Sequence, residues 1–355
     1  MRLVENRFEK HTVLTWILCS VLALGVLEIV LRTINPTFVE FPYRLRQYIS
    51  YHERWKADLI PNTRSWVRLR GNDNLELLNF LVSVNENGIR TWDRELDNNL
   101  VSMTKNTRIV HAIGDSFTMG WGVNFESSYP AQLDFLLPQN MRVISVGLSS
   151  FGTIAATEKS MQLWSKYPGV LSIYLFFEND YTDDEIATRH SQRPAFVHSL
   201  LGIWDFLRRT SYFANLPYAV YEWGYWKSLR KTGKADLIDH KNVYIDNPEH
   251  IRFSKNGLYP SDESKGVLSK KALLTYKNFL DSHSVPLWVL CFGDNEYSRD
   301  FYSFCSENGI ETYLMTVPET VTLFRDGHMN QLGNFQLARF LLELMKSQGV
   351  LDKTQ

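Results

Sequence analysis

The chain of 355 residues has few of the residues from which metal sites and disulfide frameworks are built. It contains 3 cysteines, with no Cys-x-x-Cys pair and no histidine cluster at ligand spacing. We therefore expect no metal ion and no cofactor. Cys19 lies in an apolar run, so only Cys291 and Cys305 could form a disulfide, and only in an oxidising compartment.

The chain also lacks an excess of charge of either sign. Its formal net charge is −1, and no long basic run interrupts the sequence. Affinity for nucleic acids depends on clustered Lys and Arg, so the composition gives no support for a nucleic-acid partner. Internal repeats and low-complexity tracts are absent too. With 44% apolar and 22% charged residues, the composition is that of a globular protein with a sizeable core.

One long hydrophobic run stands near the N-terminus. Residues 13–31 read VLTWILCSVLALGVLEIVL and carry a single charge, Glu28, so the run is long enough to cross a hydrocarbon core. A buried core helix would show a polar face, and a cleaved signal peptide would have a shorter apolar region and a small-residue cleavage site. We therefore predict a retained anchor that inserts into a lipid bilayer through residues 13–31.

The charges around this run favour an N-terminus inside the cytoplasm. Arg2, Arg7 and Lys10 precede the run, Arg32 follows it, and acidic residues contribute little to the positive-inside rule. We predict a single-pass membrane protein whose bulk lies outside the cytoplasm, in the periplasm if the source is a Gram-negative bacterium.

Three parts follow from the patterning. Residues 1–35 form the N-terminal tip and anchor, and residues 36–106 form a connector with a β-rich segment. Alternating residues over 63–92 predict a few antiparallel strands, which could form a small β-layer between the anchor and the main domain. Residues 107–350 form the main domain.

The main domain alternates between strand and helix patterns, which implies a parallel sheet with helices on both faces, a three-layer α/β fold. Strands are predicted over 109–113, 142–146, 170–177, 285–292 and 310–315. Helices are predicted over 129–137, 153–166, 270–284, 298–308 and 332–347. An aromatic-rich insertion at about 183–265 interrupts the alternation. Three interpretations of it stay open: core packing or a helical lid, a platform for stacking sugars, and a contact with the membrane surface.

A Gly114-Asp115-Ser116 turn directly follows the first buried strand of this domain. Open α/β sheets place their chemistry at the carboxyl ends of strands, so Ser116 is a candidate nucleophile. The alternative is that Ser116 only caps the next helix.

A serine nucleophile needs a base and donors for the oxyanion. His328 lies in a polar loop that should emerge at the same sheet edge, and Asp326 could hold its Nδ1 while Nε2 takes the serine proton. In the alternative, this is a surface loop in which Asp326 only caps a helix. The Gly- and Ser-rich turn at 143–152 could expose backbone N–H groups, and Asn179 offers a side-chain amide.

Four blocks follow one another over residues 107–347: Gly114–Thr118, Ser145–Gly152, Phe177–Asp180 and Asp326–His328. In this order they resemble the SGNH (GDSL-type) hydrolase superfamily. The resemblance implies a flavodoxin-like fold, a nucleophile at Ser116, and an oxyanion hole formed by the N–H groups of Ser116 and Ser150 and by the Asn179 amide. Ser150 falls where the family usually has a glycine, and Gly147 and Gly152 are near enough to leave the register open. Asp115 and Asp180 are expected to order the turns beside the site.

The fourth block, Asp326-Gly327-His328, is shorter than the usual Asp-x-x-His. It resembles a subgroup with Asp-Gly-His-x-Asn followed by Gly, often with a membrane helix and a segment like Val84–Arg90, and linked to modification of bacterial surface polysaccharides. The resemblance implies a serine esterase acting on acyl, above all acetyl, esters of a cell-surface carbohydrate or another small ester. Two alternatives stay open: a polysaccharide O-acetyltransferase using the same residues, and an inactive anchored binding or scaffold subunit with partners in a surface-polysaccharide assembly.

Overall fold

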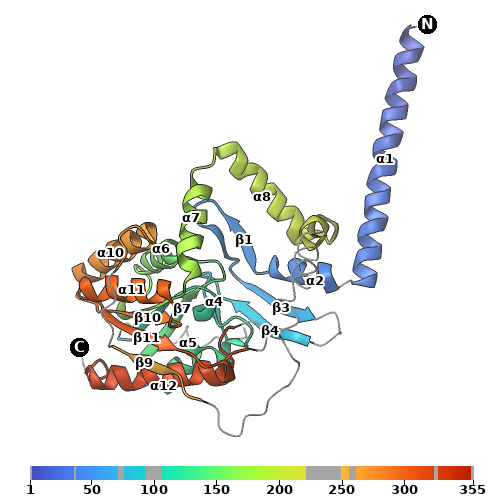
Figure 1. Cartoon of the computed structure of the whole chain (residues 1–355). Helices are drawn as coiled ribbons and strands as arrows, with labels where there is room; N and C mark the ends of the chain where they lie inside the picture. Colours follow the sequence, from blue (N-terminus) through green and yellow to red (C-terminus); the bar gives the residue numbers. More distant parts are fainter. Residues whose placement is uncertain are drawn as a thin grey trace.

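The computed structural model describes residues 2–35, 37–70, 76–92, 106–220, 249–255, 261–323 and 327–352. They form a mixed α/β fold in which a 9-stranded sheet is flanked by helices (Figure 1). This confirms the predicted fold class.

The centre of the sheet is parallel. Its strands are β7 (Met141–Gly147), β6 (Arg108–Gly114), β8 (Gly169–Phe176), β10 (Leu287–Phe292) and β11 (Glu311–Thr316), neighbours in this order. Every residue of β6 and β10 is buried, which explains why β10, and β6 apart from Arg108 and His111, read as apolar runs rather than alternating patterns. Numbered along the chain, the order is the 2-1-3-4-5 arrangement of flavodoxin-like folds.

Helices cover both faces of this sheet (Figure 1). One hydrophobic core lies under α5 (Tyr129–Leu136) and α12 (Gln331–Ser347). The other lies under α6 (Thr153–Leu163), α10 (Val267–Ser282) and α11 (Glu296–Glu307). These elements match the predicted ones to within a few residues; α6 ends at Leu163 instead of 166 because a turn follows it. Cys291 and Cys305 are both buried and free.

The β-rich segment extends the main sheet instead of forming a layer of its own. Strands β3 (Thr63–Arg70), β4 (Glu76–Val84) and β5 (Arg90–Thr91) pair antiparallel, and Arg90 of β5 pairs with Ser145 of β7. The separate β-layer considered from the sequence is therefore not formed. The pairing of Arg90 with Ser145 covers part of the edge that β7 would otherwise leave open.

The connector is more ordered than its sequence indicates. It contains α2 (Thr37–Leu45) and a hairpin of β1 (Ile49–His52) and β2 (Lys56–Leu59). The remaining short elements are α4 (Ser116–Met119), η1 (Phe125–Ser127), η2 (Phe213–Asn215), β9 (Arg252–Ser254) and η3 (Glu319–Val321). The described part of the insertion holds α7 (Asn179–Ser191) and α8 (Ala195–Thr210).

A helix at the N-terminus, α1 (Arg2–Ile34), extends away from the rest of the fold (Figure 1). By length and composition its segment Thr12–Ile34 could cross a membrane, as a single anchor or as a signal sequence. None of the segment's most apolar window is buried against the protein. The predicted boundaries at 35, 106 and 350 stay predictions.

Gly147 ends β7 where the backbone of the turn after β6 comes closest. A Cβ atom at this position would lie 2.4 Å from Met119 N, 2.8 Å from the Thr118 carbonyl carbon and 2.9 Å from the Asp115 carbonyl oxygen. All three neighbours are backbone atoms, so they cannot turn aside as a flexible side chain could. Only glycine allows α4 to rest on the end of β7.

We therefore expect Gly147→Ala to lower the free energy of unfolding by roughly 1–3 kcal/mol, the usual cost of overpacking. Urea unfolding of the detergent-solubilised chain, followed by tryptophan fluorescence, measures this. Gly202→Ala is the matched control, because no atom lies within 4 Å of a Cβ there. An unchanged unfolding curve for Gly147→Ala would contradict the tight packing.

Candidate active site

The central sheet reverses its strand order between β6 and β8. The chain leaves these neighbouring strands toward opposite faces, which opens a crevice beyond their carboxyl ends where open α/β sheets bind ligands. Ser116 follows β6, and Asn179 follows β8. The topology therefore brings the first and third sequence blocks to one edge.

Ser116 begins the short helix α4, and Asp115 caps it. One Asp115 oxygen accepts the Phe117 N–H at 2.9 Å, and the other lies 3.3 Å from Ser116 Oγ. Asp115 is fully buried, and burial raises the pKa of its carboxyl to about 6, partly offset by the hydrogen bond from Phe117 and the nearby His328. Gly114 is tightly packed as well, since a Cβ would lie 2.8 Å from the Leu175 carbonyl oxygen.

His328 lies beside Ser116 although 212 positions separate them in the sequence. Its Nε2 is 2.7 Å from Ser116 Oγ, well within hydrogen-bonding distance. The imidazole stacks on Phe117 with ring centroids 4.5 Å apart and has Trp121 on another side at 6.3 Å. These rings hold the imidazole in place. Asp326, which the sequence predicts to orient His328, lies outside the described residues.

The loop that carries His328 is ordered by Asn330 and Gly333. The Asn330 side chain accepts the Gly333 N–H at 3.0 Å and donates to the carbonyl oxygens of Thr320 and Thr322 at 3.3 and 3.2 Å. A Cβ on Gly333 would lie 2.4 Å from the Val321 carbonyl oxygen. The Asn and Gly of the fourth block thus shape the loop that presents the histidine.

Asn179 opens α7 with its side chain fixed by Asp183. Its Nδ2 donates to Asp183 Oδ2 at 3.0 Å, while its Oδ1 is buried and has no hydrogen-bond partner among the described residues. Burial raises the pKa of Asp183, and the charge of Lys56 partly offsets this. Sequence reasoning missed Asp183. The available signal was its i+4 spacing from Asn179, which places the two side chains together only if a helix begins there, and the sequence did not predict that helix.

Ser150 adopts a backbone conformation that glycine favours. Its φ is +69°, within a turn closed by the Phe151 N–H donating to the Leu148 carbonyl oxygen at 2.9 Å. The two glycines that left the register open have packing roles instead. Gly147 contacts the Ser116 turn, and a Cβ on Gly152 would lie 2.3 Å from Asp184 Oδ1. Ser150 therefore has the geometry expected where the second block normally has glycine.

Asp180, in the third block, connects the end of β8 to the start of α6, which follows the second block. Its carboxylate accepts hydrogen bonds from the Tyr174 hydroxyl at 2.6 Å and from the Phe177 N–H at 3.2 Å. The same tyrosine hydroxyl lies 2.7 Å from Thr153 Oγ1 at the start of α6. Burial, together with the neighbouring Asp115, raises the pKa of Asp180 well above its usual range. These contacts fit the predicted ordering role.

Arg90 joins the β-rich segment to the loop after Ser116. Its guanidinium donates to four carbonyl oxygens at 2.6–2.9 Å, those of Met119, Gly120, Val123 and Leu81. The side chain is 1% exposed, and burial lowers its pKa to about 10, so it stays charged at neutral pH. The sequence marked Val84–Arg90 only as a family-like segment and did not reveal this contact.

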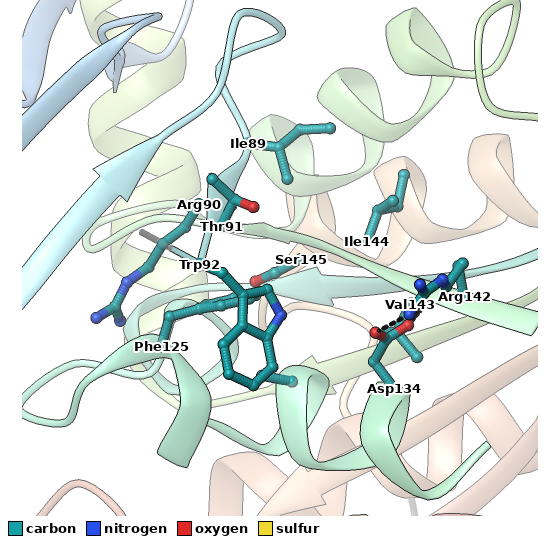
Figure 2. A pocket seen from close by; sticks show the side chains of 11 residues that line it. Ile89, Arg90, Thr91, Trp92, Phe125, Asp134, Arg142, Val143, Ile144 and Ser145 are labelled. Atoms are coloured by element: carbon teal, nitrogen blue, oxygen red, sulfur yellow. Dashed lines mark hydrogen bonds and ion pairs between the residues drawn. The ribbon is translucent and has the colours of Figure 1, made fainter. Parts of the chain in front are cut away.

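The hollow drawn in Figure 2 lies beside this arginine, at the junction of β5 and β7. Figure 2 shows Arg90 extending away from Asp134 and Arg142, which pair with each other at 2.9 Å. Neither Ser116 nor His328 lines this hollow. It is therefore separate from the candidate active site.

Comparison with known proteins returns structural neighbours only. No protein-family model matches the sequence, and no curated protein matches it significantly. Solved structures that match include the M. smegmatis aryl esterase, with 13% identity, a TM-score of 0.36, and coverage of 68% of this chain and 99% of that one. A carbohydrate acetylesterase from Sinorhizobium meliloti has 12% identity, a TM-score of 0.35, and coverage of 68% and 100%. AlinE4, an SGNH-hydrolase family esterase, has 14% identity, a TM-score of 0.31, and coverage of 71% and 100%.

We expect Arg90→Leu to lower the free energy of unfolding by about 3 kcal/mol or more, because each buried carbonyl left unpaired costs about 1–3 kcal/mol. Arg90→Lys should also destabilise the chain, since an ammonium group lacks the fork that reaches four acceptors. Urea unfolding of the solubilised chain measures both.

Arg68→Leu serves as the control, because Arg68 is an exposed arginine in the same sheet, on strand β3. Equal stability of the Arg90→Leu and Arg68→Leu variants would refute the structural role of the guanidinium.

Proposed function

We propose that this chain is a serine esterase of the SGNH (GDSL) type that cleaves acyl esters through a covalent acyl-enzyme. The observation that carries the proposal is the 2.7 Å separation of Ser116 Oγ and His328 Nε2. A nucleophile within hydrogen-bonding reach of a base is the signature of an activated serine. An inactive scaffold would not need this pair at the switch point of the sheet.

The reaction has two steps. Ser116 Oγ attacks the ester carbonyl carbon while His328 Nε2 takes its proton, and the tetrahedral intermediate collapses as the alcohol leaves with that proton. Water then attacks the acyl-enzyme with His328 again as base, which releases the acid and restores Ser116. We assign Asp326 to orient the imidazole, on the resemblance of the fourth block.

Three donors would receive the oxyanion: the N–H groups of Ser116 and Ser150 and the amide of Asn179. The left-handed backbone of Ser150 supports its place as the substituted glycine. Asp183 supports the role of Asn179 because its carboxylate accepts one N–H of the amide. This hydrogen bond fixes the amide with Nδ2, and not Oδ1, on the side that faces Asp183.

We propose acetyl esters of a cell-surface carbohydrate as the substrate, on the resemblance to the subgroup that carries Asp-Gly-His-x-Asn followed by Gly. The segment Thr12–Ile34 supports a single-pass anchor by its length and composition. The basic residues Arg2, Arg7 and Lys10 before it support an esterase part outside the cytoplasm. A sugar hydroxyl in place of water would make the same residues an O-acetyltransferase.

Ser116→Ala should abolish covalent labelling by a fluorophosphonate probe and hydrolysis of p-nitrophenyl acetate, because the alanine side chain cannot form the acyl-enzyme. In-gel fluorescence of the full-length, detergent-solubilised chain and release of p-nitrophenol measure the two losses. Circular dichroism shows that the variant is folded.

The control is Ser282→Ala, an exposed serine at the end of α10 whose hydroxyl donates to the Phe279 carbonyl oxygen at 2.7 Å. It should label and turn over like the unmodified chain. Undiminished labelling of Ser116→Ala would refute the proposed nucleophile. With acetylated glycans, free acetate indicates the hydrolase, and acetyl transfer to an added sugar indicates the transferase.

Asn179→Ala should lower kcat by about 10²–10³-fold with little change in KM, the usual cost of losing one oxyanion donor. Asp183→Ala should show a smaller loss in the same direction, because the amide remains but loses its anchor. Steady-state kinetics with p-nitrophenyl acetate measures both.

Glu185→Ala is the control on the same helix, since the Glu185 side chain is 65% exposed and pairs with Arg189 across one turn. Unchanged kcat in Asn179→Ala would remove this residue from the oxyanion hole.

A further inference from the structure

Helix α8 turns its polar side toward the protein and its apolar side outward. Its buried residues are Asp205 and Arg208. The Asp205 carboxylate accepts the Tyr51 N–H at 3.1 Å and an N–H of Arg46 at 3.2 Å. Arg208 Nε donates to Asn215 Oδ1 at 3.1 Å. A surface helix in water has the opposite arrangement, with its apolar side against the core.

The outward side of α8 carries what we call the outer apolar stripe. Its members recur mostly three or four positions apart, so they lie on one side of the helix. They are Phe196 (66% exposed), Leu200 (59%), Ile203 (58%), Trp204 (42%), Phe206 (57%) and Leu207 (43%). A contiguous exposed apolar surface of this kind marks a contact with a membrane or with another protein.

The end of α8 is fastened to the end of α1. Arg32 Nη2 donates to the Thr210 carbonyl oxygen at 2.7 Å. The Glu28 carboxylate, the one charge in the predicted span, accepts three hydrogen bonds from the residues directly after α8. They come from the Ser211 hydroxyl (2.8 Å), the Tyr212 N–H (3.0 Å) and the Phe213 N–H (2.9 Å). The two helices are therefore held together at a defined point.

We propose that α8 lies in the headgroup layer of the bilayer that α1 crosses, with the outer apolar stripe against lipid. A spanning helix leaves the hydrocarbon core near its end, so the groups bonded to Glu28 and Arg32 lie at that boundary. Figure 1 shows α8 meeting α1 at this junction, with the sheet and its helices to one side of α8. The inference rests on the anchoring role proposed for α1 and is independent of the chemistry at Ser116.

Lipid contact accounts for both sides of α8. Helices of this type sink their apolar side roughly 5–10 Å into the boundary between headgroups and acyl chains, and tryptophan is favoured there. The polar side then faces the folded body, where Asp205 and Arg208 have their partners. The body is attached to the membrane along α8 as well as at α1, which sets its orientation toward the bilayer.

Site-directed spin labelling of the full chain in vesicles of phosphatidylcholine and phosphatidylglycerol tests this placement. A nitroxide on Leu200→Cys, in a Cys19→Ser background, should collide with oxygen more readily than with a water-soluble nickel chelate. Phe135→Cys is the matched control, because Phe135 is a 78% exposed aromatic on α5, away from α1 and α8 (Figure 1). We expect the ratio of oxygen to nickel collisions to be several-fold higher at Leu200 than at Phe135.

A label on native Cys19, which is exposed within α1, separates this inference from the anchor on which it rests. If Cys19 reports lipid and Leu200 reports water, the anchor stands and the placement of α8 is wrong. A label at Leu200 that both reagents fail to reach would show protein cover and would also overturn the proposal. If Cys19 itself reports water, both the anchoring role of α1 and the placement of α8 are wrong. Labelling of Ser116 by the fluorophosphonate still tests the esterase separately.

Discussion

The contact between Ser116 and His328 depends on a constraint of parallel sheets. Their strands must all end at one edge, so the loops that follow them meet there regardless of separation along the chain. β6 and β8 are neighbours whose connections run to opposite faces, which leaves room beyond their ends for a substrate. The aromatic ring of Phe117 and the capped loop at Asn330 then bring the imidazole to 2.7 Å from the hydroxyl.

The turn that carries Ser116 is held from two directions. From below, Gly147 lets the backbone of α4 rest on the end of β7. On another side, Arg90 donates hydrogen bonds to carbonyl oxygens of the loop after α4 and to the Leu81 carbonyl oxygen on β4, which connects the two segments. Among the described residues no carboxylate pairs with this buried guanidinium, which is unusual, and the carbonyl dipoles around it take the place of a counter-ion. The antiparallel extension of the sheet is thus part of the support of the site.

Three aspartates near the candidate site order its turns and its amide. Asp115, Asp180 and Asp183 all have raised pKa values because they are removed from water. Each accepts a hydrogen bond that orders a turn or an amide, so these carboxyl groups position other residues of the site. At the other end of the molecule, the carboxylates of Glu28 and Asp205 fasten α1 and α8 to the body. The same chemistry therefore supports both the candidate catalytic edge and the junction at the proposed membrane surface.

Local patterns in the sequence determined the strands and helices of the main domain, the apolar helix at the N-terminus and the serine turn, because each depends on residues close together in the chain. Tertiary structure alone decided three contacts: the pairing of β5 with β7, the hydrogen bonds of Arg90 to the loop after Ser116, and the hydrogen bond between Asn179 and Asp183. So was the outward direction of the apolar side of α8, since periodicity reveals an amphipathic helix but not which side meets the protein. These features depend on which distant segments become neighbours, and that information lies in the packing of the whole sheet.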